Sequence, residues 1–286
     1  MFNLVNSKKL LTFANVNINI YIKMNKLLVL PDIHGRKFWK KPCENVDSFD
    51  KVIFLGDYLD PYDFEKISVK DAIENFKEII EFKKNNMEKV VLLIGNHDCP
   101  YYSDIYFSFS SWHCRHSALH HKEIHKLFED NFDLFQIAYV YEDILFTHAG
   151  VDSEWLEKTV GCEEKDINGI CSVLNGLTNT KDGLLKLYKI TPQRGGRDKY
   201  GSCIWSDVHD MMQDVIGLSS FNYIDSPIYK YKQIFGHTIQ AYYTLEGTIA
   251  FGEAIEFDNC KMLDTSKAYI LDSEKFNIEV FTNNNK

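Results

Sequence analysis

The sequence predicts an α/β fold from three short apolar segments and one amphipathic helix between two of them. The apolar segments cover residues 27–30, 51–55 and 90–94, and each is bounded by polar residues, as expected of buried strands. A helix should follow Ser68, because Ser68-Val-Lys-Asp71 resembles a capping box and the next apolar residues recur at helical spacing. Strand, helix and strand in this order imply parallel strands joined by a right-handed crossover.

The middle of the chain predicts a mixture of elements. We expect a loop or cap over the aromatic-rich residues 101–112 and a helix over residues 114–130. Residues 136–141 and 144–147 indicate a hairpin, and Asp152 is placed to cap a short helix.

Towards the C-terminus, residues 159–200 lack a strong period. A helix is expected from Asp207 and a strand over residues 232–235. Residues 268–271 and 276–280 flank a turn and predict a second hairpin.

Composition excludes some classes of protein. The 286 residues are 45% hydrophobic and 26% charged, as in globular proteins. The net charge of −9 argues against a nucleic-acid partner, which requires basic surfaces. Seven cysteines without a Cys-x-x-Cys pair indicate reduced thiols and a cytoplasmic location. The apolar run near the N-terminus is too short and too polar to span a membrane, and we expect no membrane partner.

Residues 1–23 are expected to be an N-terminal extension outside the fold, as a misassigned start codon would produce. Met24 directly precedes the first predicted strand, so residues 24–286 would form the folded domain. The alternative is that residues 1–23 form an edge strand or an arm.

Polar side chains directly follow five of the predicted strands. They are Asp32 and His34, Asp57 and Asp60, Asn96 and His97, His148, and His237. Ligands bind outside the carboxyl ends of strands in open α/β sheets, so these side chains should meet at one edge. Carboxylate, imidazole and amide ligands together suit Mn, Fe or Zn better than Ca or Mg. Each motif alone is weak, but the ordered set indicates a metal centre in which Asp57 is shared by two ions.

The set also resembles a known family. Asp32-Ile-His34-Gly, Gly56-Asp57-Tyr-Leu-Asp60, Gly95-Asn96-His97-Asp98, His148-Ala-Gly and Gly236-His237 resemble the ordered motifs of the calcineurin-like metallophosphoesterases. The likeness is closest to the branch of serine/threonine phosphoprotein phosphatases and symmetrical diadenosine tetraphosphatases. It implies two β-sheets packed face to face as a sandwich, with helices on the outer faces.

The resemblance further implies a role for each matching residue. The first divalent ion would be held by Asp32, His34 and Asp57, and the second by Asp57, Asn96, His148 and His237. His97 would be the general acid, oriented by Asp60, while a hydroxide bridging the two ions attacks phosphorus. Mn²⁺ is the ion that we expect to support activity in vitro.

Departures from the family pattern bear on the substrate. Pro61 stands where protein phosphatases carry a phosphate-binding arginine, and residue 239 is Ile where many relatives carry a further metal-binding histidine. A substitute for the missing arginine could come from Arg194, Arg197 or Arg36, because a guanidinium binds phosphate through paired hydrogen bonds.

The sequence therefore predicts a metal-dependent phosphoesterase that hydrolyses a phosphomonoester or a phosphoanhydride. The substrate would be a small phosphorylated metabolite, a nucleotide or a phosphoprotein, and a serine/threonine phosphoprotein phosphatase is the main alternative. A non-catalytic binding protein on the same scaffold is the alternative from another class, and the full set of ligands argues against it.

Overall fold

The computed structural model describes residues 25–110, 113–207, 231–238, 241–243, 249–251, 254–257 and 259–282. The extension expected at residues 1–23 lies outside these residues. So does the helix expected from Asp207, beyond that residue itself.

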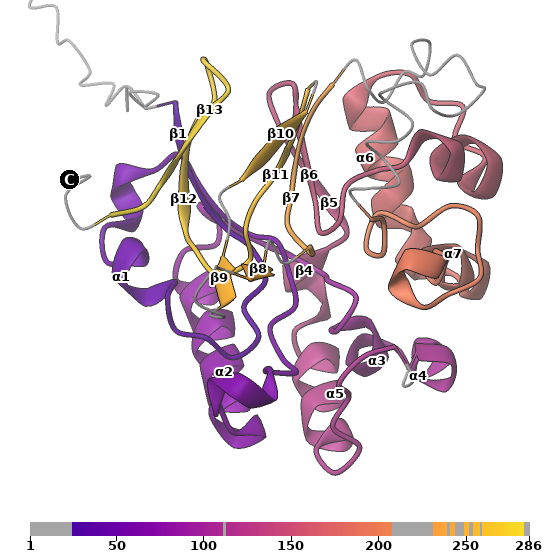
Figure 1. Cartoon of the computed structure of the whole chain (residues 1–286), viewed down its shortest axis with the longest axis horizontal. Coiled ribbons are helices and arrows are strands. Elements are labelled where there is room, and N and C mark those ends of the chain that lie inside the picture. The colour runs from indigo at the N-terminus through magenta and orange to yellow at the C-terminus, as the bar shows by residue number, and fades with distance from the viewer. Residues whose placement is uncertain are drawn as a thin grey trace, which may run out of the picture.

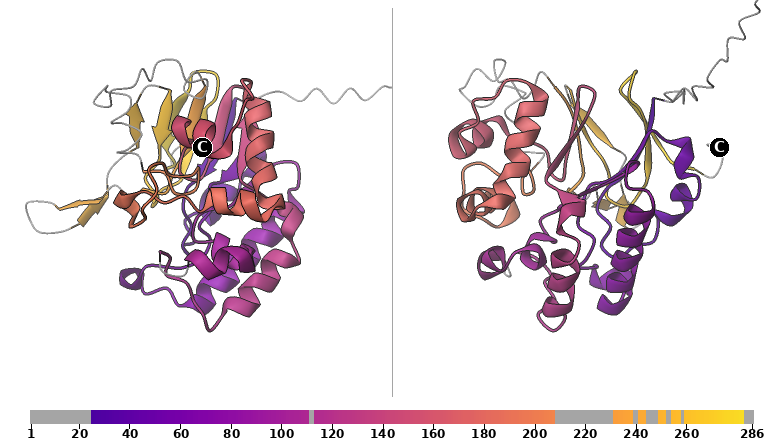
Figure 2. Two further views of the ribbon diagram at one scale, coloured as in Figure 1. Left: turned by 90° about the vertical axis from the view of Figure 1, so that its right-hand side faces the viewer. Right: turned by 180° about the vertical axis from the view of Figure 1, so that it is seen from behind.

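Two β-sheets form the centre of the molecule (Figure 1). The larger sheet has the strand order β13-β12-β1-β2-β3-β4, and the smaller one β10-β11-β7-β6-β5. The strands of the larger sheet are β1 (Lys26–Leu30), β2 (Lys51–Phe54), β3 (Val90–Leu93), β4 (Phe135–Gln136), β12 (Tyr269–Asp272) and β13 (Asn277–Val280). Those of the smaller sheet are β5 (Ala138–Tyr141), β6 (Ile144–Thr147), β7 (Lys232–Phe235), β10 (Ile255–Phe257) and β11 (Cys260–Met262). β8 (Ala241–Tyr243) and β9 (Ile249–Phe251) pair separately and project from the body of the molecule (Figure 2).

The two sheets face each other across a continuous apolar layer. Alternate residues of neighbouring strands supply it, as the period of a strand requires: Leu27, Val29, Ile53, Leu55, Val91 and Leu93 from the larger sheet, and Ile144, Phe146 and Ile234 from the smaller. The residues between them, such as Leu28 and Val52, belong to a second core that includes the helices. This arrangement confirms the predicted α/β fold with two face-to-face sheets.

Helices cover the outer faces of the sandwich. α1 and α2 lie outside the larger sheet, and α6 and α7 lie beside the smaller one (Figures 1 and 2). The α-helices are α1 (Lys40–Cys43), α2 (Val69–Asn85), α3 (Cys99–Tyr102), α4 (Asp104–Ser110), α5 (His121–Glu129), α6 (Ile167–Gly176) and α7 (Lys181–Leu187). Short turns of helix are η1 (Val46–Ser48), η2 (Asp63–Glu65), η3 (Phe132–Leu134), the π-helix η4 (Trp155–Val160), η5 (Leu177–Asn179) and η6 (Pro192–Arg194). Within the described residues, no helix is long and apolar enough to cross a membrane.

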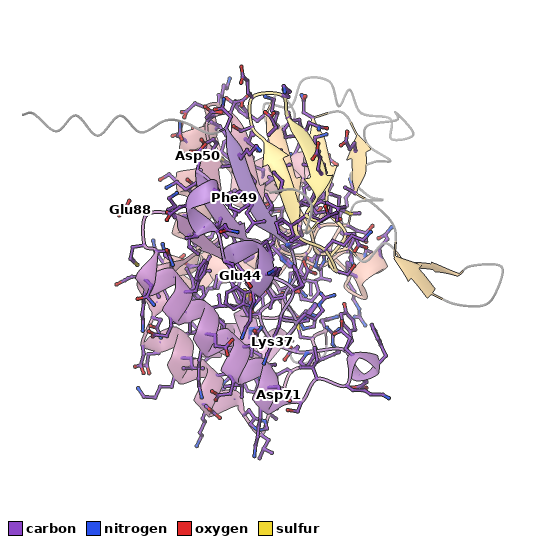
Figure 3. All side chains as sticks on the ribbon, turned by 90° about the vertical axis from the view of Figure 1, so that its left-hand side faces the viewer. Lys37, Glu44, Phe49, Asp50, Asp71 and Glu88 are labelled. Atoms are coloured by element: carbon purple, nitrogen blue, oxygen red, sulfur yellow. The ribbon has the colours of Figure 1, made fainter. Side chains whose placement is uncertain are left out.

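The crossover helix α2 begins as the sequence predicts. Ser68 Oγ accepts a hydrogen bond of 3.1 Å from Asp71 N, which caps the first turn. Asp71, near the start of α2, and Glu88, just beyond its end, lie at opposite ends of the helix in Figure 3. The helix returns the chain from β2 to β3, which pair in parallel.

One prediction for the middle of the chain is wrong and another is confirmed only in part. Residues 101–112, expected to form a loop or cap, are not a loop: they include the end of α3 and the whole of α4, because Tyr101, Tyr102 and Tyr106 are buried and tertiary packing, rather than a polar–apolar period, stabilises these turns. The helix expected over residues 114–130 is confirmed only in its second half, as α5 from His121 to Glu129.

The predicted hairpin over residues 136–141 and 144–147 is confirmed only in part. β5 and β6 do pair antiparallel, but Gln136 belongs to β4 in the other sheet, so the chain changes sheets at Ile137. Asn175 of α6 stabilises this passage, because its Oδ1 accepts bonds of 2.9 Å from both Ile137 N and Ala138 N. The strand at residues 232–235 and the C-terminal hairpin are confirmed as β7, β12 and β13.

Candidate metal centre

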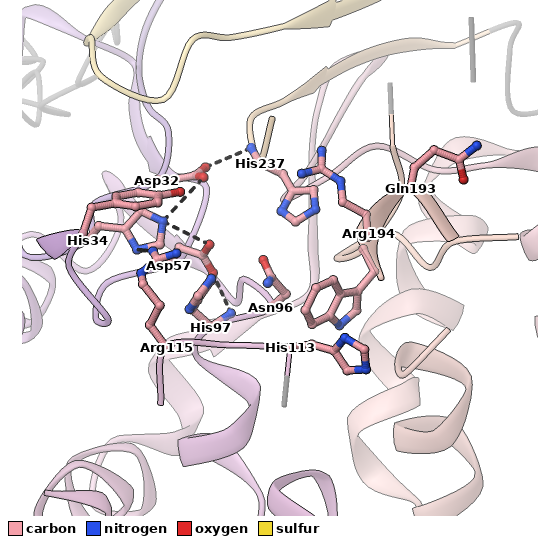
Figure 4. Close-up of a pocket in the computed structure, with 12 residues that line it drawn as sticks. Asp32, His34, Asp57, Asn96, His97, His113, Arg115, Gln193, Arg194 and His237 are labelled. Atoms are coloured by element: carbon pink, nitrogen blue, oxygen red, sulfur yellow. Dashed lines mark hydrogen bonds and ion pairs between the residues drawn. The ribbon is translucent and has the colours of Figure 1, made fainter. Parts of the chain in front are cut away.

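The carboxyl ends of five strands meet at one edge of the sandwich. β1, β2 and β3 of the larger sheet and β6 and β7 of the smaller sheet each end beside this edge. They bring together Asp32, His34, Asp57, Asn96, His97, His148 and His237, all of which are buried (Figure 4 draws all but His148). The structure thus gathers the predicted metal-binding residues, which lie up to 205 positions apart in the sequence, in one place.

One carboxylate oxygen lies between two groups of side chains. Asp57 Oδ2 is 3.5 Å from His34 Nε2 and also 3.5 Å from His148 Nε2. Candidate ligand atoms of Asp57, His148 and His237 all lie within 4.8 Å of one another, and so do those of Asp57, His34 and His97. Asp57 is the member that the two groups share.

The chemistry of these side chains fits a divalent cation. His148 Nδ1 lies 2.9 Å from the Leu55 carbonyl oxygen, so Nδ1 carries the proton and donates it. Nε2 of His148 then presents a lone pair to Asn96 Oδ1, 3.0 Å away, and to Asp57 Oδ2. When that imidazole is neutral, acceptor atoms this close repel one another unless a cation lies among them, so the arrangement fits a metal ion.

His34 and His237 also present a ring nitrogen that could bind a metal ion. His34 Nδ1 lies 2.8 Å from the Leu59 carbonyl oxygen, which directs Nε2 to the centre. His237 Nε2 is buried and has no hydrogen-bond partner among the described residues. Burial, followed by nearby positive groups, lowers the pKa of His34 and of His237 well below the usual range, so both imidazoles are neutral and able to bind metal.

Asp32 completes the edge on the side of His34. Its Oδ2 is 3.9 Å from His34 Nε2, and its Oδ1 accepts a bond of 2.9 Å from His237 N. Burial, together with the carboxylate of Asp57, raises the pKa of Asp32 above its ordinary value. A cation between the two carboxylates would remove that repulsion.

The backbone of the centre is strained. His34, Asp57, Asp60 and His237 have φ angles of 44°, 53°, 56° and 69°. A positive φ is uncommon for residues other than glycine and costs about 1–3 kcal/mol each. Four such residues around one edge indicate that the loops are held in conformations that serve the site rather than stability.

Glycines allow the loops after β2 and β3 to touch. A Cβ on Gly56 would lie 2.4 Å from Gly95 N, and a Cβ on Gly95 would lie 2.2 Å from Asp57 Oδ1. Neither position has room for a side chain, so both glycines are required for the close approach.

Asp98 fixes these two loops from behind. Its carboxylate is fully buried and accepts bonds from Asp57 N at 2.7 Å, Tyr58 N at 2.9 Å and Gly95 N at 2.9 Å. The sequence motif contained Asp98, but reasoning from sequence assigned it no role. It orients the backbone that carries Asp57.

His97 and Asp60 form a hydrogen-bonded pair beside the centre. His97 Nδ1 lies 2.9 Å from Asp60 Oδ2, and His97 N donates a bond of 2.8 Å to Asp57 Oδ1. With Nδ1 bonded to the carboxylate, Nε2 is the ring nitrogen left to exchange a proton with a ligand.

A cavity of about 270 Å³ opens over these residues. Besides Arg194 and other predicted site residues it is lined by Tyr62, His113, Arg115, Gln193 and Trp205. Arg115 and Arg194 approach it from opposite sides in Figure 4.

The four arginines of the chain are placed differently. Arg194 lines the cavity, and its Nε lies 2.8 Å from Asp207 Oδ2. Arg197 is exposed and does not line the cavity. Arg36 donates bonds to the backbone oxygens of Asp32 and Ile33 at 2.9 and 3.1 Å, and it too lies off the cavity wall.

Arg115 is a charged residue of the cavity wall that sequence reasoning missed. Its guanidinium lies 3.6 Å from the ring centre of Tyr62 and donates to the Asp60 backbone oxygen at 2.8 and 3.1 Å. Residue 115 fell within a predicted helix, and only the turns at residues 113–120 bring it to the cavity. No local pattern in the sequence signals that position.

Comparisons with known proteins agree with the motifs. The family model described as calcineurin-like phosphoesterase matches residues 26–238, most of the chain. None of the curated proteins matches it. Among solved structures, it is similar to the cold-active protein-tyrosine phosphatase of a psychrophilic Shewanella species, with 12% identity over 90% of this chain and 80% of that one and a TM-score of 0.48. It is also similar to a Saccharomyces cerevisiae serine/threonine phosphatase that resembles human phosphatase PP5, with 14% identity over 90% and 79% and a TM-score of 0.47. Likenesses this distant indicate no substrate.

Proposed function

Because the chain belongs to the calcineurin-like phosphoesterase family, we propose that it is a dinuclear metal-dependent phosphatase. Its reaction is the hydrolysis of a phosphomonoester or a phosphoanhydride. The observation that carries this proposal is the position of Asp57 Oδ2, 3.5 Å from a histidine nitrogen on each side. A carboxylate placed in this way suits two ions rather than one.

Two groups of residues would hold the ions. The first group is Asp32, His34 and Asp57, and the second is Asp57, Asn96, His148 and His237. Mn, Fe and Zn all suit these ligands. When bound, such ions lower the pKa of a coordinated water and offset the negative charge of a phosphoryl group.

The arginines on the cavity wall would hold the phosphate. A guanidinium has five N–H donors, so the bonds from Arg115 to Asp60 leave donors for a phosphate oxygen. Stacking on Tyr62 holds the plane of that guanidinium in a fixed orientation. Arg194 faces it from the wall that carries His237, and the two together would orient the substrate.

His97 would act as the general acid. Asp60 accepts a hydrogen bond from Nδ1–H of His97, so Nε2 presents the second proton of the imidazolium to the departing oxygen. The acid and the candidate phosphate-binding arginines line the same cavity.

Hydrolysis of p-nitrophenyl phosphate with Mn²⁺ tests the proposal. We expect turnover by the wild-type protein, loss of turnover after chelation, and a loss of about 10²-fold or more in His97→Asn on poorer leaving groups. Glu123, on the exposed surface of α5, supplies a matched control as Glu123→Gln. If wild type turns over no faster than His97→Asn on every phosphoester, nucleotide and phosphopeptide tried, the chain is a binding protein instead.

A further inference from the structure

Asp60, the carboxylate beside His97, accepts hydrogen bonds from other groups besides His97. Its Oδ2 lies 2.9 Å from His97 Nδ1, and its Oδ1 accepts a bond of 2.6 Å from the Tyr101 hydroxyl. Its backbone oxygen accepts two bonds from Arg115. Since Asp60 has a φ of 56°, these contacts hold a strained residue in place.

Tyr101 lies behind this pair, on α3, the helix that begins directly after the loop carrying His97. The side chain is fully buried, its ring stacks on His116 with centroids 4.6 Å apart, and its oxygen accepts a bond of 2.7 Å from Ser117 N. Burial, and then the carboxylate of Asp60, raise the pKa of Tyr101, so the hydroxyl keeps its proton and donates it.

We infer that Tyr101 is a positioning residue for proton transfer to the leaving group, acting through Asp60 on His97. This inference rests on the proposed function, in which His97 is the general acid. The hydroxyl of Tyr101 donates a hydrogen bond to Asp60 Oδ1 and thereby prevents the carboxylate from rotating. Oδ2 of Asp60 is therefore kept opposite His97 Nδ1. The ring of His97 then stays oriented with Nε2 towards the cavity.

The proton balance follows from this geometry. The imidazolium of His97 starts with protons on both nitrogens. As the bond between phosphorus and the leaving oxygen breaks, the Nε2 proton passes to that oxygen. The neutral ring of His97 keeps the proton on Nδ1 and continues to donate it in the hydrogen bond to Asp60. Tyr101 keeps its own proton throughout.

A positioning role can be separated from a structural one by the leaving group. An acidic leaving group departs without a proton, whereas a basic one needs the general acid, so a misaligned acid slows only the basic leaving groups. Tyr101 also accepts a bond from Ser117 N, close in sequence to Arg115, and a displacement of Arg115 would instead slow all substrates alike, because every substrate carries the same phosphate.

The experiment measures kcat and KM of Tyr101→Phe on dinitrophenyl, p-nitrophenyl, phenyl and benzyl phosphate. We expect kcat to fall by about tenfold on phenyl and benzyl phosphate and by less than about twofold on dinitrophenyl phosphate, with KM unchanged. Tyr102→Phe is the matched control, because Tyr102 is the next residue of α3 and is also buried, but packs against Phe128 and Phe132. It should leave the whole series unchanged. Equal losses on all four substrates in Tyr101→Phe would overturn the inference.

Two further variants separate this inference from the function on which it rests. In an Asp60→Ala background, Tyr101→Phe should have no further effect, because the two residues act through one carboxylate; a further loss of the same size as in wild type contradicts the inference. His97→Asn should show a steeper dependence on the leaving group than Tyr101→Phe. If His97→Asn is flat across the series, the assignment of the general acid itself fails.

Discussion

Replacing Asp98 by asparagine tests how far the centre depends on one buried carboxylate. Asp98 Oδ2 accepts from Asp57 N and Gly95 N, and Oδ1 accepts from Tyr58 N, at 2.7, 2.9 and 2.9 Å. Asparagine has the same size but only one acceptor oxygen, so its NH₂ group must face a backbone N–H. At least one bond is lost, and both the backbone N–H and the NH₂ group that faces it are left buried without an acceptor. Each unsatisfied buried donor costs about 1–3 kcal/mol, so Asp98→Asn should destabilise the protein by about 3 kcal/mol.

Thermal unfolding of the metal-free protein measures this loss. In a protein of this size 1 kcal/mol corresponds to about 2–4 °C, so the Tm should fall by about 6–12 °C. Because Asp98 also holds the backbone of Asp57, the affinity for Mn²⁺ measured by calorimetry should fall by about tenfold or more. Asp47→Asn is the control, since the Asp47 side chain is 95% exposed. If Asp98→Asn matches Asp47→Asn in both Tm and Mn²⁺ affinity, the three hydrogen bonds that Asp98 accepts do not support the site.

Three other changes test separate parts of the account. Arg115→Ala should raise the KM for a phosphomonoester by about tenfold or more through the loss of charge-assisted bonds, whereas Arg197→Ala should leave KM unchanged; equal effects would remove Arg115 from the phosphate site. In the metal-free protein His34 and His237 should contribute a loss of stability as the pH falls below about 6.5, because they are neutral when folded but bind protons when unfolded, whereas Asp32, with its raised pKa, contributes the opposite slope. The free energy of unfolding should change by up to about 1.4 kcal/mol per pH unit for each histidine, and this slope should flatten when both are replaced by asparagine. An unchanged slope would refute the claim that both histidines are neutral in the folded protein. Ser68→Ala should lower the free energy of unfolding by about 1 kcal/mol without changing activity, and denaturant titration would show no change if the cap of α2 contributes nothing.

The strands that carry the site could be predicted because their signals are local. β1, β2 and β3 are short apolar runs bounded by polar residues, and the motif that follows each run lies where the chain leaves the sheet. The parallel arrangement follows from the amphipathic helix between β2 and β3. These local features were enough to place Asp32, Asp57 and Asn96 at one edge.

Other parts of the fold depend on contacts between distant segments. α3 and α4 form where tyrosines are buried, and the sequence of this segment has no helical period that would predict them. α6 and α7 begin directly after Asp166 and Thr180, whose side chains cap them, in a region whose composition suggested no element. At the change of sheet, Ile137 N donates a hydrogen bond to Asn175, thirty-eight residues later.

Arg115 shows most clearly why the site could not be completed from sequence. Its guanidinium reaches the cavity because its bonds to the Asp60 backbone oxygen and its stacking on Tyr62 place it there. Both partners lie more than fifty residues earlier in the chain. A search for a substitute arginine by local motif therefore found Arg194 but also Arg36 and Arg197, which lie off the cavity wall.

The measurement that tests the central claim most directly is a titration of metal-free protein with Mn²⁺, following bound metal per chain and hydrolysis of p-nitrophenyl phosphate together. Asp57 Oδ2 lies between two sets of ligands, so we expect two ions to bind, activity to appear with the second, and Asp57→Asn to weaken the binding of both. Full activity with one ion bound, or two ions bound by Asp57→Asn as tightly as by the wild type, would contradict a dinuclear centre that shares Asp57.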